Sequence, residues 1–430
     1  MIDIPNGYKQ TEVGVIPEDW EVRQLKDFIT IKSGFAFSSK HFSDNGPILL
    51  TPGNFKLEGG LYFNERNTKH YSGPYSTSMI FDYNDLLIVM TDLTPDCNLL
   101  GKPAFIKLHE PILHNQRIGK IITRNKRFAL EFLYWFFLSD SYTIRMKETA
   151  TGSTVRHTSN GSIYSSLIAH PPTKAEQEAI AEALSDADAL IESLEQLIAK
   201  KRHLKQAAMQ ELLTGKKRLP GLSGRWEVLR LGDVADPNQK WSFTGGPFGS
   251  NLKSSDYTDD GVRIIQLQNI GDGLFHNNYA VFTSPEKADE LLSCNIYPGE
   301  IILSKMGDPV ARACLIPPHH ERYLMCSDGI RLAVNQKRFN TYFVYVSINA
   351  PDFRTRAENA GTGSTRKRIG LTELRNLELL CPELPEQTAI ATILSDMDAE
   401  IATLETKLAK TRQIKQGMMQ ELLTGKTRLM

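Results

Sequence analysis

The sequence has little cysteine and no long apolar run. No two cysteines form a Cys-x-x-Cys pair, and the five are scattered along the chain: Cys97, Cys294, Cys314, Cys326 and Cys381. This argues against a zinc site and against a disulfide framework, and it fits a reducing compartment. The longest apolar run, Phe132 to Leu138, is far shorter than the roughly 20 residues of a membrane span. The opening MIDIPNGYKQTEVG lacks the basic start and apolar core of a signal peptide, so we expect a cytoplasmic protein.

The sequence also lacks an excess of charge of either sign. Lys plus Arg total 50 and Asp plus Glu total 50 in a chain of 430 residues. Proteins that bind DNA unaided often have a basic excess. The balance lowers the expectation of tight DNA binding by this chain alone, but it leaves room for local basic faces and for partners that supply positive charge.

Enzyme motifs are missing as well. The sequence has no NPPY-type methyltransferase motif, no glycine-rich cofactor loop after a strand and no HExxH. The GKT at 425–427 lacks the earlier glycine of a P-loop, and the Pro-Asp pairs at 95–96 and 351–352 lack the acidic-x-Lys partner of a nuclease centre. The His-His-Glu at 319–321 is more readily a loop than a metal site, because no cysteine or carboxylate pattern surrounds it. We therefore predict no catalytic residues, no metal site and no cofactor in this chain.

What the chain does contain is an internal repeat. Residues 176–219 and 386–429 align without a gap at an offset of 210 (386 minus 176), and roughly 28 of about 45 positions are identical. The similarity extends backwards to two aromatic-rich segments that end in TGST, whereas residues 30–125 and 236–338 are hard to align. A constant scaffold with two unlike inserts suits a reader of two different targets better than a duplicated enzyme, whose catalytic residues should recur in both halves.

The repeated segments carry the apolar stripe of a long helix. Apolar residues recur at steps of three and four, at Ile180, Leu184, Ala187, Ile191, Leu194 and Ile198, and in the second copy at Ile390, Leu394, Met397, Ile401, Leu404 and Leu408. This is an a/d stripe of coiled-coil type, and prolines before and glycines after each segment mark its ends. A helix of about 40 residues spans roughly 60 Å. We predict an antiparallel pair of these helices within the chain; the alternative is a coiled coil between two chains.

The remaining residues read as two mixed α/β domains with short strands, predicted at 47–50, 85–90, 102–108, 119–123, 262–270 and 300–306. Each domain closes with one aromatic helix, at 129–147 and 340–357, whose Phe132, Trp135, Phe136 and Phe343 we assign to the core. The fold class is thus α+β, with two globular α/β domains separated by two long helices packed as an antiparallel coiled coil with a pseudo-two-fold axis. The predicted divisions are recognition domains at 1–170 and 220–380 and helical spacers at 171–219 and 381–430.

Four stretches of the sequence resemble the specificity (S) subunits of type I restriction-modification enzymes. They are YKQTEVGVIPEDWEVRQL, GPFGSNLKSSDYTDDGVRIIQLQNI, the GTGSTRKRI loop and, most specifically, the twin helices that end in ELLTGK. The resemblance covers nearly the whole chain and implies two target-recognition domains and two conserved helical spacers. It also implies partners: double-stranded DNA, methyltransferase (M) subunits, usually two, and restriction (R) subunits that translocate and cleave DNA. S-adenosylmethionine, ATP and Mg are then expected on the partner subunits.

Candidate base-reading residues lie in loops after the predicted strands. Arg and Lys suit guanine, and Asn and Gln suit adenine. In the second domain the candidates are Gln266, Gln268, Asn269, Lys305 and Arg312, and in the first they are Lys32, Ser33, Asn54, Thr91 and Asp92. Each could instead be a solvated loop side chain.

Candidate phosphate contacts lie in the TGST turn of each half. Glycines let backbone N–H groups approach an anion, and cations add a salt-dependent attraction. The candidates are Thr365, Arg366, Lys367 and Arg368 in the second half, and Thr154, Arg156 and His157 in the first. The basic runs 200–202 and 216–218 could equally face solvent, an M subunit or DNA.

The sequence therefore predicts a non-catalytic DNA-specificity subunit that binds an asymmetric bipartite target and docks M and R subunits. One alternative is a coiled-coil scaffold without sequence-specific DNA reading. A further alternative is a stand-alone nuclease or methyltransferase.

Overall fold

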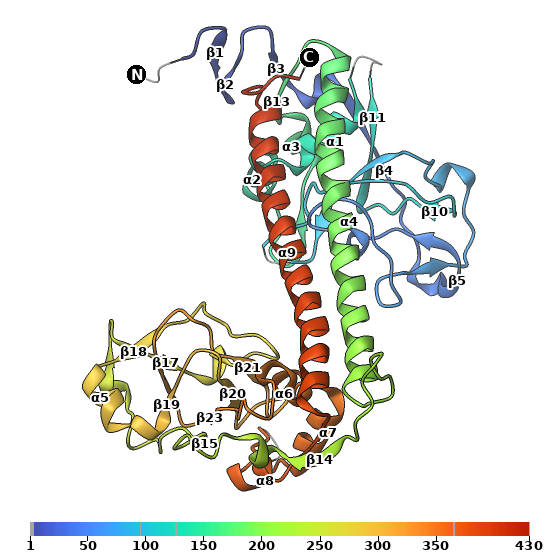
Figure 1. The fold of residues 1–430 in the computed structure, drawn as a ribbon. Helices are drawn as coiled ribbons and strands as arrows, with labels where there is room; N and C mark the ends of the chain where they lie inside the picture. The colour runs from blue at the N-terminus through green and yellow to red at the C-terminus, as the bar shows by residue number, and fades with distance from the viewer. Residues whose placement is uncertain (1–3, 95, 125–127, 364–365, 430) are drawn as a thin grey trace. The chain divides into compact units, whose positions relative to one another are not determined.

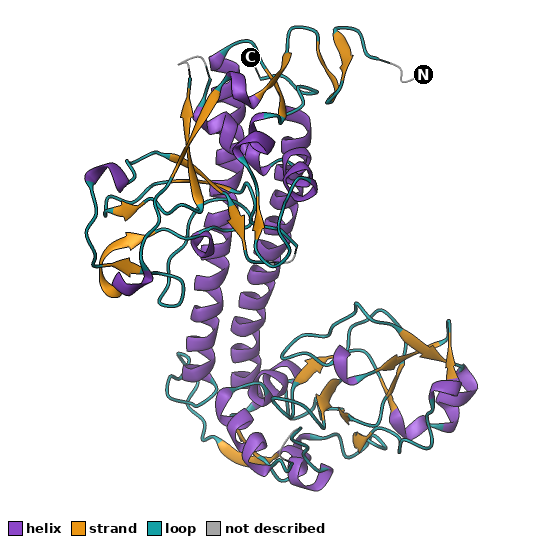
Figure 2. Cartoon of the chain, turned by 180° about the vertical axis from the view of Figure 1, so that it is seen from behind, coloured by secondary structure: helices purple, strands orange, loops and turns teal. Residues whose placement is uncertain are grey.

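The computed structural model of the chain describes residues 4–94, 96–124, 128–363 and 366–429. The chain folds into two compact units. Unit 1 comprises residues 1–195 and 407–430, and unit 2 comprises residues 196–406. Each unit contains an α/β domain and a part of each of two long helices (Figures 1 and 2). This confirms the predicted α+β fold class.

The two long helices are α4 (Lys174–Leu212) and α9 (Leu384–Leu422), each of 39 residues. Figure 1 shows them in green and red. The predicted stripe is buried or half-buried, with Leu184 and Leu394 fully inaccessible. Because neither helix can bury such a stripe alone, each needs a partner surface.

Ion pairs within each unit fix the direction of the helix pair. In unit 1, Arg412 binds Glu195 (2.5 Å) and Lys415 binds Asp188. In unit 2 the repeat-equivalent pairs are Arg202 with Glu405 (2.5 Å) and Lys205 with Asp398 (2.5 Å). In each unit the residue number falls along one helix as it rises along the other, so the pairing is antiparallel and intramolecular, as predicted.

Unit 1 contains a four-stranded antiparallel sheet in the order β4-β11-β7-β9 and a three-stranded sheet in the order β10-β5-β6. Its strands are β1 (Tyr8–Thr11), β2 (Gly14–Pro17), β3 (Glu21–Gln24), β4 (Ile29–Ser33), β5 (Phe42–Leu49), β6 (His70–Tyr71), β7 (Leu86–Val89), β8 (Thr91–Asp92), β9 (Pro103–Phe105), β10 (Ile112–Leu113), β11 (Ile118–Thr123), β12 (Arg156–His157) and β13 (Leu167–His170). Its short helices are α1 (Leu130–Leu138), α2 (Asp140–Glu148) and α3 (Asn160–Tyr164).

Unit 2 contains a four-stranded sheet in the order β15-β23-β20-β21 and a five-stranded sheet in the order β16-β18-β17-β22-β19. Its strands are β14 (Glu227–Arg230), β15 (Phe243–Gly245), β16 (Tyr257–Thr258), β17 (Val262–Ile265), β18 (Val281–Thr283), β19 (Asn295–Ile296), β20 (Ile301–Ser304), β21 (Ala313–Leu315), β22 (Tyr323–Met325), β23 (Gly329–Leu332) and β24 (Glu378–Cys381). Its short helices are α5 (Pro285–Glu290), α6 (Thr341–Ile348), α7 (Pro351–Ala360) and α8 (Leu371–Arg375).

The segments that resist sequence alignment share one topology. In each unit the first strand of the four-stranded sheet, β4 or β15, pairs with the last, β11 or β23, which pairs with the central β7 or β20. In each unit a strand of the second sheet, β5 or β17, pairs in parallel with the strand that precedes β11 or β23. The duplication therefore includes the variable domains, whose side chains have diverged on a shared backbone.

The aromatic segments differ from the prediction in one respect. Each forms two helices, α1 with α2 and α6 with α7, where the sequence predicted one. Ser139 accepts from the N–H of Tyr142 (3.4 Å) at the start of α2, and Pro351 occupies the first turn of α7. Side chains that cap a new helix, and a proline without an N–H, both favour a restart. The aromatic residues themselves, including Phe132 and Phe343, are buried as predicted.

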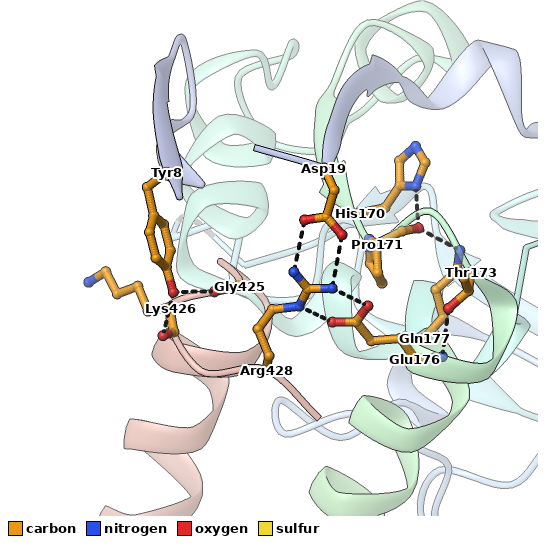
Figure 3. A network of polar contacts seen from close by, with 10 residues as sticks. All are labelled: Tyr8, Asp19, His170, Pro171, Thr173, Glu176, Gln177, Gly425, Lys426 and Arg428. Atoms are coloured by element: carbon orange, nitrogen blue, oxygen red, sulfur yellow. Dashed lines mark hydrogen bonds and ion pairs between the residues drawn. The ribbon is translucent and has the colours of Figure 1, made fainter. Parts of the chain in front are cut away.

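A bidentate arginine ties the C-terminal segment to the rest of unit 1 (Figure 3). Arg428 binds both carboxylate oxygens of Glu176 and both of Asp19, and the Tyr8 hydroxyl donates to the carbonyl of Lys426 (3.1 Å). In unit 2, Arg218 binds both oxygens of Glu386 (2.7 Å each). The two ends of the repeat are thus held by the same contact. Among the described residues, no helix combines the length and apolar character needed to cross a membrane.

Candidate nucleic-acid interface

In unit 2 the residues that follow the TGST motif, 366–369, lie against the end of the central strand β20. Arg368 forms β-bridges with Thr362 and with Met306. The N–H of Gly307 donates to the carbonyl of Lys367 (3.1 Å), and the N–H of Ile369 donates to that of Lys305 (2.9 Å). The fold therefore brings Lys305 close to Lys367 and Arg368, although 62 residues separate Lys305 from Lys367 in the sequence (367 minus 305). Thr365 and Pro95 lie outside the described residues.

Carboxylates hold two of these cations. Arg368 pairs with Asp328 (2.9 Å), and Lys367 pairs with Glu358 (3.1 Å). Arg366 is exposed. Arg312 is half-buried in the β20–β21 connection, where its backbone N–H donates to the Ser304 hydroxyl oxygen (3.0 Å). Arg366 could bind a phosphate directly. Lys367 and Arg368 could do so only by releasing the carboxylates that they now bind.

The connection between β22 and β23, residues 326–328, contacts the residues at the ends of three other strands. The N–H of Cys326 donates to Ile265 O (2.9 Å), and the N–H of Lys305 donates to Asp328 O (2.7 Å). The N–H of Gly246 donates to the carbonyl of Gly329 (2.8 Å). The ends of β15, β17 and β20 therefore meet on one surface, and we call this surface the edge of unit 2.

Two glutamines stand at this edge. Gln266 is half-buried and donates to the hydroxyl of Tyr257 (3.2 Å), while the exposed Gln268 donates to the Gln266 side-chain oxygen (3.3 Å). A glutamine carboxamide offers one donor and one acceptor side by side, which matches the adjacent donor and acceptor of adenine in the major groove. Gln266 and Gln268 therefore remain candidates for base reading.

Asn269 and its unit 1 counterpart Asn54 have a structural role and are no longer candidates for base reading. Asn269 is 1% exposed; it accepts from the N–H of Gln266 (2.9 Å) and donates to two carbonyls. Asn54 is 0% exposed and accepts in the same way from the N–H of Thr51 (2.9 Å). Each asparagine satisfies the backbone polar groups of a buried loop, which are costly to leave unpaired. A side chain so enclosed does not reach a base edge.

In unit 1 the TGST turn folds in the same way, with Thr151 bridging His157 and with β12 paired to β8. Thr91 and Asp92 are buried there. The Asp92 carboxylate accepts from the N–H groups of Thr94 (2.8 Å) and Leu99 (2.7 Å), and the Thr91 hydroxyl contacts His157 Nδ1 (3.0 Å). These contacts make Thr91 and Asp92 turn-forming residues, so we withdraw both as base-reading candidates.

The other predicted residues of unit 1 reach solvent. Lys32, Ser33, Thr154 and His157 are exposed, and Arg156 is half-buried. Lys32 lies at the end of β4, next to the edge where β11 begins, and Arg156 donates to the carbonyl of Gly152 (2.7 Å).

Sequence reasoning missed residues 115–117 of unit 1. The N–H of Met90 donates to the carbonyl of Arg117 (2.9 Å), as that of Lys305 does to Asp328 in unit 2. Gln116 and Arg117 are exposed, and with Asn115, Lys69 and Thr51 they line a recess of about 330 Å³. The polar run His-Asn-Gln-Arg at 114–117, one residue ahead of the predicted strand 119–123, was the signal that could have identified them.

The preceding residue, His114, belongs to the framework. It is 2% exposed, its Nε2 contacts the carbonyl of Ile118 (2.9 Å), and burial lowers its pKa to about 4. Its ring is therefore neutral at physiological pH and adds no charge to the surface beside it.

Comparisons with known proteins agree with this architecture. The model of the family "Type I restriction modification DNA specificity domain" matches residues 17–200 and 224–414. The type I restriction enzyme MjaIX specificity subunit of Methanocaldococcus jannaschii is 22% identical over 98% of this chain and 96% of its own length. The EcoBI specificity subunit of Escherichia coli is 22% identical over 95% of this chain and 86% of its own length.

Solved structures show the same fold. The S subunit of a type I restriction-modification system from M. genitalium superposes with a TM-score of 0.60 at 16% identity, covering 98% of each chain. A chain from a structural study of type I complex assembly gives 0.54 at 16% identity, covering 96% of this chain and 99% of its own. Because the family model matches twice and spans most of both units, this chain belongs to the type I restriction-modification DNA specificity family.

Proposed function

We propose that this chain selects an asymmetric, bipartite DNA sequence for a type I restriction-modification complex and is itself non-catalytic. Each unit would read one half-site through the edge described above. The main support for this proposal is a difference between the buried and the accessible positions that the two units share. The buried Asn54 and Asn269 are the same residue in both units, whereas the polar edge around them differs.

The accessible positions of that edge carry different chemistry in the two units. In unit 2 the residue directly before the buried Asn269 is Gln268, whereas in unit 1 the residue directly before the buried Asn54 is Gly53. Unit 1 places Arg117 where unit 2 has Asp328. Since direct readout depends on the donors and acceptors offered to base edges, unlike edges predict unlike half-sites.

The partners in this proposal are double-stranded DNA, M subunits, two in number, and R subunits. S-adenosylmethionine, ATP and Mg would be bound by the M and R subunits, and the complex would act in the cytoplasm. A chain with 50 basic and 50 acidic residues gains from partners that supply further positive charge along the duplex.

Selection from random duplexes, using the full chain assembled with its M subunits, tests the proposal. We expect two short conserved blocks separated by an unread gap. Replacing residues 1–170 with the corresponding domain of a relative should change one block only. Equal binding to every duplex would instead support the coiled-coil scaffold, and methylation or cleavage by this chain alone would contradict a non-catalytic role.

A further inference from the structure

Phe248 is the most exposed large apolar side chain among the described residues, at 84%. It lies in the loop that follows β15, between Pro247 and Gly249. At the base of this loop, Gly246 packs so closely against Cys326 that any side chain there would collide with the Cys326 carbonyl. This close packing fixes the base of the loop. The N–H of Asn251 donates to the carbonyl of Phe248 (2.8 Å), which closes a tight turn. The aromatic ring thus projects from a turn with an anchored base.

Unit 1 has no equivalent projection among its described residues. Its loop runs five residues from Gly34 to the short helix at Ser39, whereas that of unit 2 runs eight from Gly246 to Ser254 (39 minus 34; 254 minus 246). The aromatic Phe37 of the shorter loop is half-buried and packs against Tyr71 (4.9 Å between ring centroids). The added length in unit 2 therefore carries an aromatic side chain away from its own core.

The loop of Phe248 emerges beside the candidate base-reading and phosphate-binding residues. β15 and β20 both pair with β23, so the ends of β15 and β20 lie on the same edge, about 10 Å apart at the usual strand spacing. Lys305 follows β20, and Cys326, which packs on Gly246, donates to the carbonyl of Ile265 just before Gln266. The immediate neighbours of Phe248 are glycine, serine, asparagine and proline. Cations and amides around a single aromatic side chain suit a nucleic acid better than an apolar protein surface.

We propose that Phe248 is a wedge that inserts between two adjacent base pairs of the half-site bound by unit 2 and unstacks that step. Apolar side chains that enter a groove in this way kink the duplex and let it contact more protein surface. The inference rests on the proposed function and adds to it a specificity determinant, because flexible pyrimidine–purine steps unstack most readily. We therefore expect the step under Phe248 to be of this type.

The test places the fluorescent base 2-aminopurine, which brightens when it loses its stacking partner, at single positions of the selected half-site. The full chain is assembled with its M subunits. The signal of interest is the difference between the wild type and Phe248→Ala, because base flipping by a methyltransferase is common to both. We expect one step to brighten several-fold with the wild type and not with Phe248→Ala, which should also bind roughly tenfold more weakly. Phe248→Leu should retain most of the signal.

Val228→Ala is the matched control, since Val228 is 62% exposed on β14 and lies outside the loops that form the edge. It should behave as the wild type. The wedge is refuted if Phe248→Ala binds the DNA and brightens the same step as the wild type does. It is also refuted if Phe248→Ala binds more weakly but no step brightens with either protein, because that result indicates a contact in the groove without unstacking. If no sequence is selected at all, the proposed function fails, and the wedge fails with it.

Discussion

Arg428 and Arg218 occupy equivalent positions in the two repeats, and each binds both carboxylate oxygens of a glutamate in the first turn of a long helix. Glu176, which is 9% exposed, would lose its bidentate partner in Arg428→Ala and stay enclosed. We expect a loss of about 2 kcal/mol in the free energy of unfolding, which allows for the partial exposure of the arginine. Urea denaturation measures it.

Arg412→Ala is the control for that experiment. Arg412 also pairs with a glutamate, Glu195, but both side chains are about half exposed. Exposed pairs contribute roughly 0–1 kcal/mol, so this variant should unfold close to the wild type. Equal losses in the two variants would mean that enclosure of Glu176 has no energetic consequence.

Asn269 and Gln268 are neighbours with opposite expected phenotypes. Asn269→Ala leaves the N–H of Gln266 and two carbonyls without their buried partner, so we expect a loss of about 1–3 kcal/mol in stability. Gln268→Ala should leave stability unchanged and relax the base preference at one position, by about 1–3 kcal/mol of discrimination. Thermal unfolding and repeated selection from random duplexes separate the two effects. A changed target in Asn269→Ala at full stability would contradict the assignment.

His114 makes the stability of unit 1 depend on pH. Burial lowers its pKa from 6.5 to about 4, so the folded protein favours the neutral ring. The contribution is complete above pH 6.5 and is lost as the pH falls from 6.5 towards 4, where the unfolded chain takes up the proton first. It amounts to about 3 kcal/mol. Urea unfolding across this range should show a shallower dependence in His114→Gln, and parallel curves for the two proteins would refute the assignment.

At the scale of elements, the turn at residues 366–368 of unit 2, directly after the TGST motif, should act through charge. Arg366 is exposed and Lys305 lies beside the turn, so each is expected to neutralise a phosphate. The double variant Arg366→Ala/Lys305→Ala should reduce the slope of log K against log salt by roughly 1.8, at about 0.9 per phosphate contact. The exposed Lys337, away from this edge, serves as the control, and Lys337→Ala should leave the slope unchanged. An unchanged slope in the double variant would remove the turn from the interface.

The long helices could be predicted from sequence because their signal is local. A stripe repeating every three or four residues, with proline before it and glycine after it, depends only on neighbours along the chain. The role of Asn269 could not be predicted, because its partners include Tyr279, ten residues away in a loop with no regular pattern. For the same reason Arg117 was missed. Its place at the edge follows from strand pairing with β7, which sequence periodicity does not specify.

At the scale of the whole molecule, the equal numbers of basic and acidic residues are consistent with the many ion pairs within each unit. Along the helix pair, Lys and Arg side chains are bound to Asp and Glu within each unit, as in Lys205 with Asp398 and Lys415 with Asp188. Such cations hold the scaffold and are less available to DNA. The cations expected to contact phosphate are few: they lie at residues 366–368 of unit 2, at Lys305 beside them and at Arg156 of unit 1. A neutral chain can therefore still present a basic edge.

The length of the helices should set the gap in the DNA target. Each of α4 and α9 has 39 residues and rises about 58 Å at 1.5 Å per residue. Deleting seven equivalent residues from the middle of both helices removes two turns, about 10 Å, and preserves the phase of the apolar stripe. We expect the unread gap to shorten by roughly three base pairs, at 3.4 Å per pair, while both half-sites stay the same. Deleting the same residues from one helix alone should break the antiparallel register and lower stability without yielding a defined new gap. If the doubly shortened chain selects the original spacing from random duplexes, the helices do not measure the distance between the half-sites.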